Sequence, residues 1–190
     1  MNLTSLHNGI LKVEKIYHFC QSNVYSLSSS VFGNDLGDKN QDRPTIFLNF
    51  NGVLNNNNSD LSVLYIVEPE NLQNVKYIVD ATNGEIVLCT TCVYSPECLK
   101  FLKSSFNKHE IPLWIDTTLP KRDVDKADEI SDFINEKREG KIKNFVIIDD
   151  LELEKFGENR DFMDGHFVYV NRAFGLTKKD AMKAIDILNK

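Results

Sequence analysis

From residue 45 onward, short apolar runs alternate with segments whose apolar residues recur at helical spacing. The runs are nearly continuous, which is typical of parallel strands that are buried on both faces of a sheet. They lie at Ile46–Leu48, Ile86–Cys89, Leu113–Ile115, Phe145–Ile148 and Phe167–Val170. Because strands that alternate with helices build open parallel sheets, this pattern predicts an α/β fold with a doubly wound, Rossmann-like parallel sheet.

The segments between these runs carry the start and stop signals of helices. A helix is predicted for Pro69–Thr82, and Asn83-Gly84 provides its C-terminal stop. Ser95-Pro96 is an N-cap and first-turn pair for a second helix. A third is predicted for Asp125–Lys137, and a variant capping box begins a final helix. The capping box is Thr177 to Asp180, and the apolar face predicted for that helix consists of Met182, Ile185 and Leu188.

The first 44 residues lack this alternation and are interpreted as an N-terminal extension to a domain of residues 45–190. Apolar spacing predicts an amphipathic helix near residues 10–20, and polar residues up to Arg43 indicate a linker. The tract Asn55–Asn58 is interpreted as a solvated loop, and Val63–Val67 as one strand of a small flap.

Composition narrows the class of protein. The 190 residues suffice for one domain with a sizeable core, and the net charge of −6 weighs against a broad nucleic-acid interface. No apolar run approaches the ~20 residues that span a bilayer, and no secretory signal pattern is evident. We therefore expect a soluble, cytoplasmic chain. Cys89 and Cys92 have C-x-x-C spacing, but Cys89 ends an apolar strand, which favours a core position over redox or metal chemistry.

Polar side chains follow the first two predicted strands. Asn49 and Asn51 come directly after the first strand, and Gly52 permits a tight turn beside them. Thr90 follows the second strand, with Thr91 as the alternative. Because ligands of open α/β sheets bind outside the carboxyl ends of the strands, these residues are candidates for a site.

Charged side chains complete the set of candidates. Lys126 begins a predicted helix and is the candidate for a basic residue at the site. Lys121 and Arg122 are close competitors for that position. Asp149 and Asp150 end the fourth strand. Two adjacent carboxylates repel each other and need a cation nearby, and carboxylate oxygens are suitable ligands for Mg²⁺.

The order of these motifs resembles that of the haloacid dehalogenase-like (HAD) phosphohydrolases, whose first strand is followed by Asp-x-Asp-Gly. The resemblance covers residues 45–188. Within this family, the chain is similar in particular to the HAD domain of bacterial RNA-repair proteins and to small bacterial phosphatases. It implies a nucleophile at position 49 and a general acid/base at position 51. It also implies phosphate contacts from Thr90 and Lys126. The implied Mg²⁺ site consists of Asn49, Asn51, Asp149 and Asp150.

Both motif-one positions depart from this family pattern, because Asn49 and Asn51 stand where the family has Asp. A carboxamide is a poor nucleophile and cannot carry a proton between steps, so we expect an inactive or nearly inactive phosphatase that still binds phosphate. Two explanations remain open. The chain is either a natural pseudo-phosphatase that binds phosphorylated partners or an Asp-to-Asn variant of an active enzyme; the intact remaining motifs favour the second.

The segments between the motifs are too short for a cap domain, so the resemblance implies a capless HAD fold with a site open to macromolecules. The acidic net charge favours a phosphoprotein, including phosphotyrosine, as the phosphorylated macromolecule. Nucleic-acid ends and small phosphoesters are the alternatives. An interaction domain without any phosphate role is a further hypothesis, which predicts that phosphate and Mg²⁺ leave the melting temperature unchanged.

Overall fold

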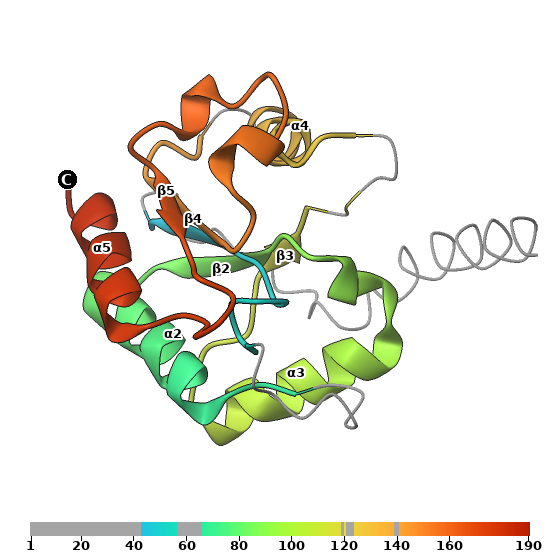
Figure 1. Ribbon diagram of the computed structural model, residues 1–190, viewed down its shortest axis with the longest axis vertical. Coiled ribbons are helices and arrows are strands. Elements are labelled where there is room, and N and C mark those ends of the chain that lie inside the picture. The colour runs from blue at the N-terminus through green and yellow to red at the C-terminus, as the bar shows by residue number, and fades with distance from the viewer. Residues whose placement is uncertain (1–42, 57–65, 119, 121–123, 139–140) are drawn as a thin grey trace, which may run out of the picture. The chain divides into compact units, whose positions relative to one another are not determined.

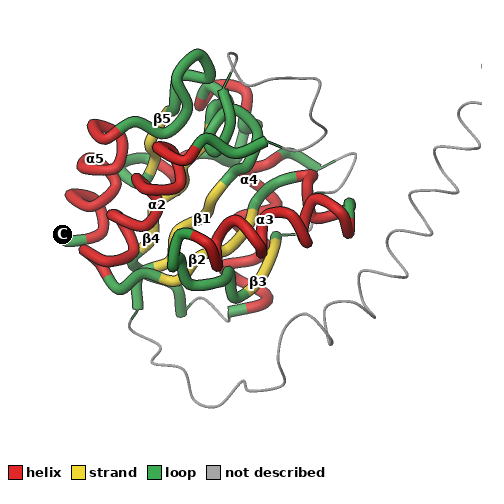
Figure 2. The backbone as a smooth tube through the Cα atoms, turned by 90° about the horizontal axis from the view of Figure 1, so that it is seen from below, coloured by secondary structure: helices red, strands yellow, loops and turns green. Residues whose placement is uncertain are grey.

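The computed structural model describes residues 43–56, 66–118, 120, 124–138 and 141–190. Within these residues, five parallel strands form one sheet in the order β3-β2-β1-β4-β5. The strands are β1 Thr45–Leu48, β2 Glu85–Leu88, β3 Asp116–Thr117, β4 Phe145–Asp149 and β5 Phe167–Tyr169. Figure 2 shows β1 in the middle of the sheet, between β2 and β4. The predicted doubly wound parallel sheet is confirmed.

Helices cover both faces of the sheet (Figure 1). Helices α2, α3 and α5 lie on one face, and α4 lies on the other. Helix α4 continues as a π-helical segment, and the strands pack against both through a cluster that includes Phe47, Ile130 and Phe133. The helices are α2 Pro69–Thr82, α3 Pro96–Lys108, α4 Lys126–Asp132 with the π-helical segment Phe133–Lys137, and α5 Lys178–Leu188. None of the described helices has the length and hydropathy of a membrane span.

Local signals in the sequence fix several helix ends. Asn83 ends α2 in the left-handed conformation, and the hydroxyl of Ser95 accepts a hydrogen bond from the backbone N–H of Cys98 at the start of α3. The capping box of Thr177 and Asp180 at the start of α5 is present in both directions. These three predictions are confirmed.

Two predicted details are wrong. The third strand was predicted at Leu113–Ile115, but pairing with β2 occurs at Asp116–Thr117. Of the three residues in that run, Trp114 is buried, and its ring meets Phe106 edge-on at 5.7 Å between centroids. On α5, Met182 is 53% exposed, because the helix turns its small residues to the core. The buried residues of α5 are Ala181, Ala184, Ile187 and Leu188.

Some predictions concern residues outside the described ranges. They include the helix near residues 10–20, most of the proposed flap strand Val63–Val67, and the competing cations Lys121 and Arg122. The division into an extension and a domain of residues 45–190 stays a prediction. Among the described residues, the connections between strands contain helices and short turns and no cap domain.

Candidate active site

The sheet topology places the candidate residues at one edge. The chain runs outward from β1 through β2 to β3 and then returns to β4 on the opposite side of β1. The carboxyl ends of β1 and β4 therefore form a topological switch point, which is where open α/β sheets bind ligands. Asn49 directly follows β1 and Asp149 ends β4, and the backbone N–H of Asn49 donates to the carbonyl of Ile148 at 3.1 Å.

Gly52 brings the turn after β1 against the carboxylate pair. Its φ of 70° lies in the left-handed region, and a Cβ at this position would lie 2.3 Å from Oδ2 of Asp150. The Asn55 side chain accepts from the Gly52 N–H at 2.7 Å and holds the turn. A side chain at position 52 would thus displace Asp150, so the glycine is required by both backbone conformation and close approach.

The Asn49 amide lies between the two carboxylates. Its Nδ2 is 2.9 Å from Oδ1 of Asp150, 3.4 Å from Oδ1 of Asp149 and 2.9 Å from the carbonyl of Asn51. Ionised carboxylates only accept hydrogen bonds, so the amide must turn its nitrogen toward them. Asn49 is therefore a neutral donor in a position where the family pattern has a third carboxylate. The Asn51 side chain, by contrast, is exposed.

Lys126 forms an ion pair with the buried Asp149, whose side chain is 1% exposed. Burial acts to lower the pKa of Lys126, but the interactions with the neighbouring Cys89 and Asp149 hold that pKa above its ordinary value. Burial raises the pKa of Asp149 above its ordinary value, and the ammonium of Lys126 opposes that rise. The position of Lys126 at the start of α4 thus brings a cation to the carboxyl edge of the sheet, beside Asp149.

Arg172 supplies a second cation that the sequence analysis did not identify. Its Nη2 and Nε lie 2.7 Å and 2.8 Å from the same oxygen, Oδ2 of Asp150, and form a charge-assisted ion pair with it. Arg172 comes from the loop after β5, at the same edge of the sheet as Asp150. That loop follows a predicted strand end, and this position was the signal that could have identified it. In the described site, two cations therefore face two carboxylates.

Thr90 follows β2 and is buried. Its hydroxyl oxygen accepts from the backbone N–H of Cys92 at 3.4 Å and caps the 3₁₀ turn Thr91–Tyr94. Because β2 lies next to β1, Thr90 is at the same sheet edge as Asn49. Thr91 is exposed, so Thr90 remains the better candidate of the two.

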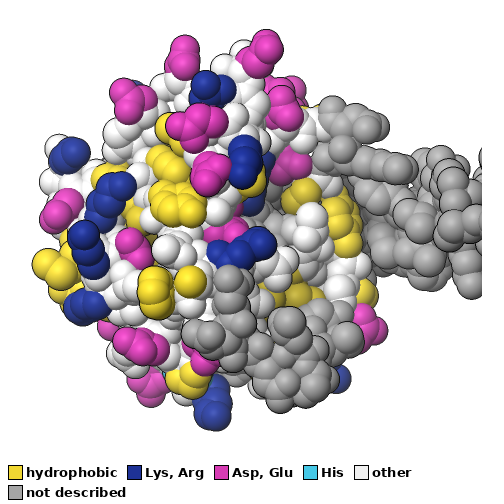
Figure 3. All heavy atoms as spheres, viewed as in Figure 1, with side chains coloured by type: hydrophobic (Ala, Val, Ile, Leu, Met, Phe, Trp, Pro, Cys, Tyr) yellow, Lys and Arg dark blue, Asp and Glu magenta, His cyan; other side chains and the backbone are white. Residues whose placement is uncertain are grey.

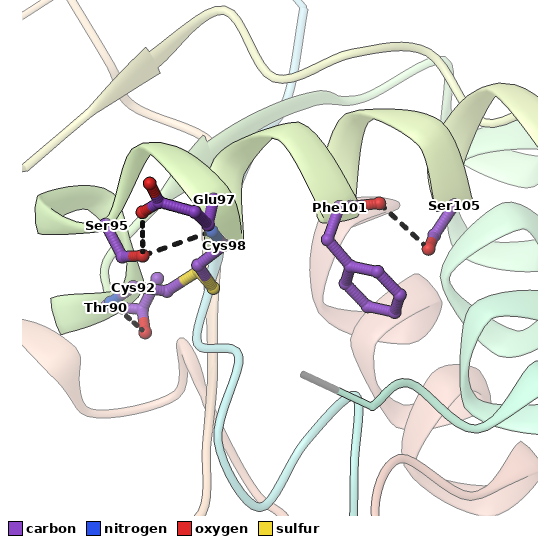
Figure 4. Close-up of a disulfide and its surroundings, with 7 residues drawn as sticks. All are labelled: Thr90, Cys92, Ser95, Glu97, Cys98, Phe101 and Ser105. Atoms are coloured by element: carbon purple, nitrogen blue, oxygen red, sulfur yellow. Dashed lines mark hydrogen bonds between the residues drawn. A yellow bond between two sulfur atoms is a disulfide. The ribbon is translucent and has the colours of Figure 1, made fainter. Parts of the chain in front are cut away.

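A disulfide joins Cys92 to Cys98 beside Thr90 (Figure 4). It connects the turn after β2 to the first turn of α3. Cys89 is a buried free thiol, and burial raises its pKa to about 12. The bonded partner of Cys92 is thus Cys98, and the C-x-x-C pair that the sequence offered is not a disulfide. The sequence analysis did not predict this connection.

The donor atoms suit Mg²⁺ in kind. The two carboxylates and the Asn49 amide oxygen are oxygen ligands, and one or two carboxylates are usual for protein-bound Mg²⁺. Within the described residues, no group of three or more His, Cys, Asp or Glu side chains could hold a metal ion. A Mg²⁺ site built from these oxygens would require the Asn49 amide to rotate its oxygen inward and Arg172 to leave Asp150.

Comparison with known proteins gives one family. The model of the family described as the HAD domain in Swiss Army Knife RNA repair proteins matches residues 45–181. No curated protein and no solved structure matches the chain. The matched range includes all five strands and the residues at their carboxyl ends, from Asn49 to Arg172. HAD domains are phosphohydrolases by family, and their members typically use Mg²⁺. The chain therefore belongs to the HAD domain family of Swiss Army Knife RNA repair proteins.

Proposed function

We propose that this domain binds the terminal phosphate of an RNA end in a HAD-type phosphatase site whose hydrolytic step is suppressed by Asn49 and Asn51. The family match to RNA repair proteins supports a nucleic-acid end. The acidic net charge had favoured a phosphoprotein, including a phosphotyrosine protein, and that partner remains the competing proposal. Both proposals share a macromolecule with a terminal or side-chain phosphomonoester.

The observation that carries the proposal is the Asn49 amide between Asp149 and Asp150, with Lys126 paired to one of them. The site retains the cation and the carboxylates of a phosphatase of this family. It lacks the nucleophilic carboxylate, because a carboxamide does not form the aspartyl-phosphate intermediate. Asn51 likewise cannot protonate a leaving group or activate water. In this proposal, the site thus keeps the groups that would bind phosphate and lacks the groups that would react with it.

Each remaining residue has a defined role toward a bound phosphate. The ammonium of Lys126 would attract the phosphoryl oxygens, and Asp149 fixes its position by the ion pair. The hydroxyl of Thr90, which at present accepts a hydrogen bond, can donate its proton to a phosphoryl oxygen. Mg²⁺ would polarise a phosphoryl oxygen when bound. Its ligands would be oxygens of Asn49, Asn51, Asp149 and Asp150.

The test compares hydrolysis of p-nitrophenyl phosphate, with Mg²⁺, by this chain and by the double variant Asn49→Asp plus Asn51→Asp. Restoring the acid/base position alone is worth roughly 10²–10⁴-fold, and restoring the nucleophile adds to this. We therefore expect a gain of at least about 10²-fold. A charge-matched control, Asn107→Asp plus Asn135→Asp, places the same two charges on exposed residues of α3 and the π-helical segment and should gain nothing.

Two further measurements complete the test. Intact mass should show that Asn51, which precedes Gly52, has not deamidated, since a new carboxylate there would restore part of the activity. Phosphate release by the double variant from phosphorylated oligoribonucleotides should exceed release from phosphotyrosine peptides. A double variant that folds and binds phosphate yet stays inert would refute the silenced-phosphatase proposal. Faster release from the peptides would replace the RNA end with a phosphoprotein.

A further inference from the structure

We propose that the loop of residues 171–175 recognises the nucleotide that carries the terminal phosphate, with Arg172 contacting the phosphate and Phe174 stacking on the base. This inference rests on the proposed function, because it assumes that the site binds a nucleic-acid end. The loop connects β5 to α5 and supplies Arg172 to the site. It therefore lies directly beside the position of a bound phosphate.

The loop has a defined internal conformation. The side-chain oxygen of Asn171 accepts from the N–H of Ala173 at 2.9 Å, and the Asn171 carbonyl accepts from the N–H of Phe174 at 2.9 Å. The same carbonyl accepts from the N–H of Gly175 at 3.1 Å. These hydrogen bonds form a tight turn whose first residue acts as the acceptor. Arg172 and Phe174 are presented by this turn, so their backbone positions are fixed relative to each other.

The loop is also anchored to the turn after β1. The N–H of Leu176, which is fully buried, donates to the carbonyl of Val53 at 2.9 Å, and the Asn56 side chain donates to the carbonyl of Phe174 at 3.4 Å. Gly175 has a φ of 71°, and a Cβ there would lie only 3.0 Å from the Val53 carbonyl oxygen. The recognition loop and the motif-one turn thus form one packed unit, and a ligand bound at Asn49 would lie beside both.

The Phe174 ring is presented to solvent on this anchored backbone. Its exposed fraction is 63%, the largest of the exposed large hydrophobic residues in the described part of the chain. A scattered exposed aromatic residue would need no explanation, but this one lies two residues from the arginine that reaches the site. Aromatic rings on a basic or cationic rim are the usual platforms on which single-stranded bases stack. The exposed Phe174 ring is therefore better placed to stack on a base than to pack in the core.

Arg172 suits the phosphate of the same nucleotide. Its side chain is 61% exposed although its guanidinium reaches Asp150, so it lies between the site and solvent. A guanidinium that pairs with one carboxylate oxygen of Asp150 can pair with phosphate oxygens, which arginine recognises well. A phosphate dianion at the site would compete with Asp150 for Arg172. One arginine and one aromatic ring could then hold one terminal nucleotide.

The charge of the chain favours recognition of one terminal nucleotide over a long strand. A net charge of −6 repels an extended polyanion, whereas a single phosphate requires only local cations. On the face shown in Figure 3, basic, acidic and hydrophobic side chains lie close together without a broad basic surface. Affinity for single strands falls with salt in proportion to the number of phosphates neutralised. We therefore expect a slope of log Kd against log salt concentration of only about 1.

The test measures the affinity of single-stranded oligoribonucleotides with a 5′ or a 3′ terminal phosphate, of the same strands with an abasic terminal residue, and of inorganic phosphate. Phe174→Ala should weaken binding of the intact phosphorylated strand by roughly 5- to 150-fold, the range measured for loss of one stacked base. It should not change the affinity for the abasic strand or for inorganic phosphate. Phe174→Trp should restore or tighten binding, and Arg172→Gln should weaken all phosphorylated probes.

The matched control is Tyr77→Ala, which removes a partly exposed aromatic ring from α2. It should leave the affinity of every probe unchanged. The inference is overturned if Phe174→Ala leaves the affinity for the phosphorylated strand unchanged, or weakens inorganic phosphate equally. Tighter binding of a phosphotyrosine peptide than of the strand would also overturn it. If the unmodified chain binds neither inorganic phosphate nor phosphorylated strands, the proposed function itself fails, which is a different outcome from failure of the loop alone.

Discussion

Replacing Asn49 by Asp tests whether the amide neutralises the site. The Asn49 Nδ2 donates to Asp150 at 2.9 Å and to Asp149 at 3.4 Å, so the substitution replaces an N–H donor by an anionic oxygen at the same place. Two attractive contacts become contacts between like charges, in surroundings where Asp149 is almost fully buried. We expect Asn49→Asp to lower the free energy of unfolding in the absence of Mg²⁺.

The size of the loss follows from two bounds. A hydrogen bond to a charged group contributes about 1.5–3 kcal/mol, so losing the shorter contact sets a lower bound of about 1.5 kcal/mol. The new carboxyl can escape repulsion by taking up a proton. At pH 7 that costs about 4 kcal/mol, at 1.36 kcal/mol for each pH unit above an ordinary pKa of about 3.9. We therefore expect destabilisation by about 1.5–4 kcal/mol, which is roughly 3–16 °C in Tm for a chain of this size.

The stability of the Asn49→Asp variant should depend on pH and on Mg²⁺ in a definite direction. Repulsion raises the pKa of the new carboxyl in the folded state, so the folded chain keeps a proton that the unfolded chain releases. The stability of the variant relative to the parent should then fall as pH rises above about 4, and the difference at pH 5 should not exceed about 1.5 kcal/mol. Mg²⁺ should restore stability to the variant more than to the parent, because it binds the folded state.

The assay is thermal and denaturant unfolding of the parent and variant at pH 5 and pH 7, with EDTA or with Mg²⁺. Asn51→Asp is the matched control, because the exposed Asn51 side chain should tolerate the same new charge with a much smaller change. Equal stability of parent and Asn49→Asp at pH 7 in EDTA would refute the neutralisation argument. So would a loss that stays constant between pH 5 and pH 7.

Three further predictions concern the disulfide, the buried thiol and the cap of α5. Replacing both Cys92 and Cys98 by Ser should lower the free energy of unfolding by about 2 kcal/mol, because it opens a short covalent loop. Denaturant titrations under oxidising conditions measure this loss. An equal loss on reduction of the parent would support the prediction, and no loss in the variant would contradict it. Cys89, in a Cys20→Ser background, should resist iodoacetamide at pH 8 until the chain is unfolded, because burial raises its pKa to about 12; mass spectrometry detects the adduct. Thr177→Ala should cost about 1 kcal/mol by loss of the α5 cap, with unchanged phosphate affinity by calorimetry.

The sequence was sufficient for the parts of the site that lie at strand ends. Asn49 and Asp149 each follow a short, continuous apolar run, so the end of the strand and the position of the polar residue could be predicted together. Lys126 was identified through its position at a helix start and through the family resemblance. In each case, a local pattern determined where a strand ends or a helix begins at the carboxyl edge of the sheet. The parallel topology brought these positions together.

The features that were missed depend on contacts between distant residues. The side chain of Arg172 reaches Asp150 across 22 residues, and nothing in the spacing distinguishes it from an exposed arginine of a loop. The pairing of Cys92 with Cys98 depends on how the turn after β2 meets α3, which cysteine spacing does not determine. The face of α5 was misjudged because Met182 was assigned to the core by hydrophobicity, whereas close packing against α2 and the sheet selects alanine.

The two amides change the electrostatics of the site as well as its chemistry. With Asn at positions 49 and 51, the charges of Asp149 and Asp150 are matched by Lys126 and Arg172. With Asp at both positions, the same cations would face four carboxylates, and the excess of two negative charges would favour a divalent cation and oppose a phosphate dianion. The substitutions thus remove the nucleophile and also the repulsion that a phosphate would meet without Mg²⁺. This charge balance agrees with the proposed function, in which the site binds phosphate without hydrolysing it. Removing either Lys126 or Asp149 would leave an uncompensated charge beside the sheet, so the ion pair matters for stability as well as for phosphate binding.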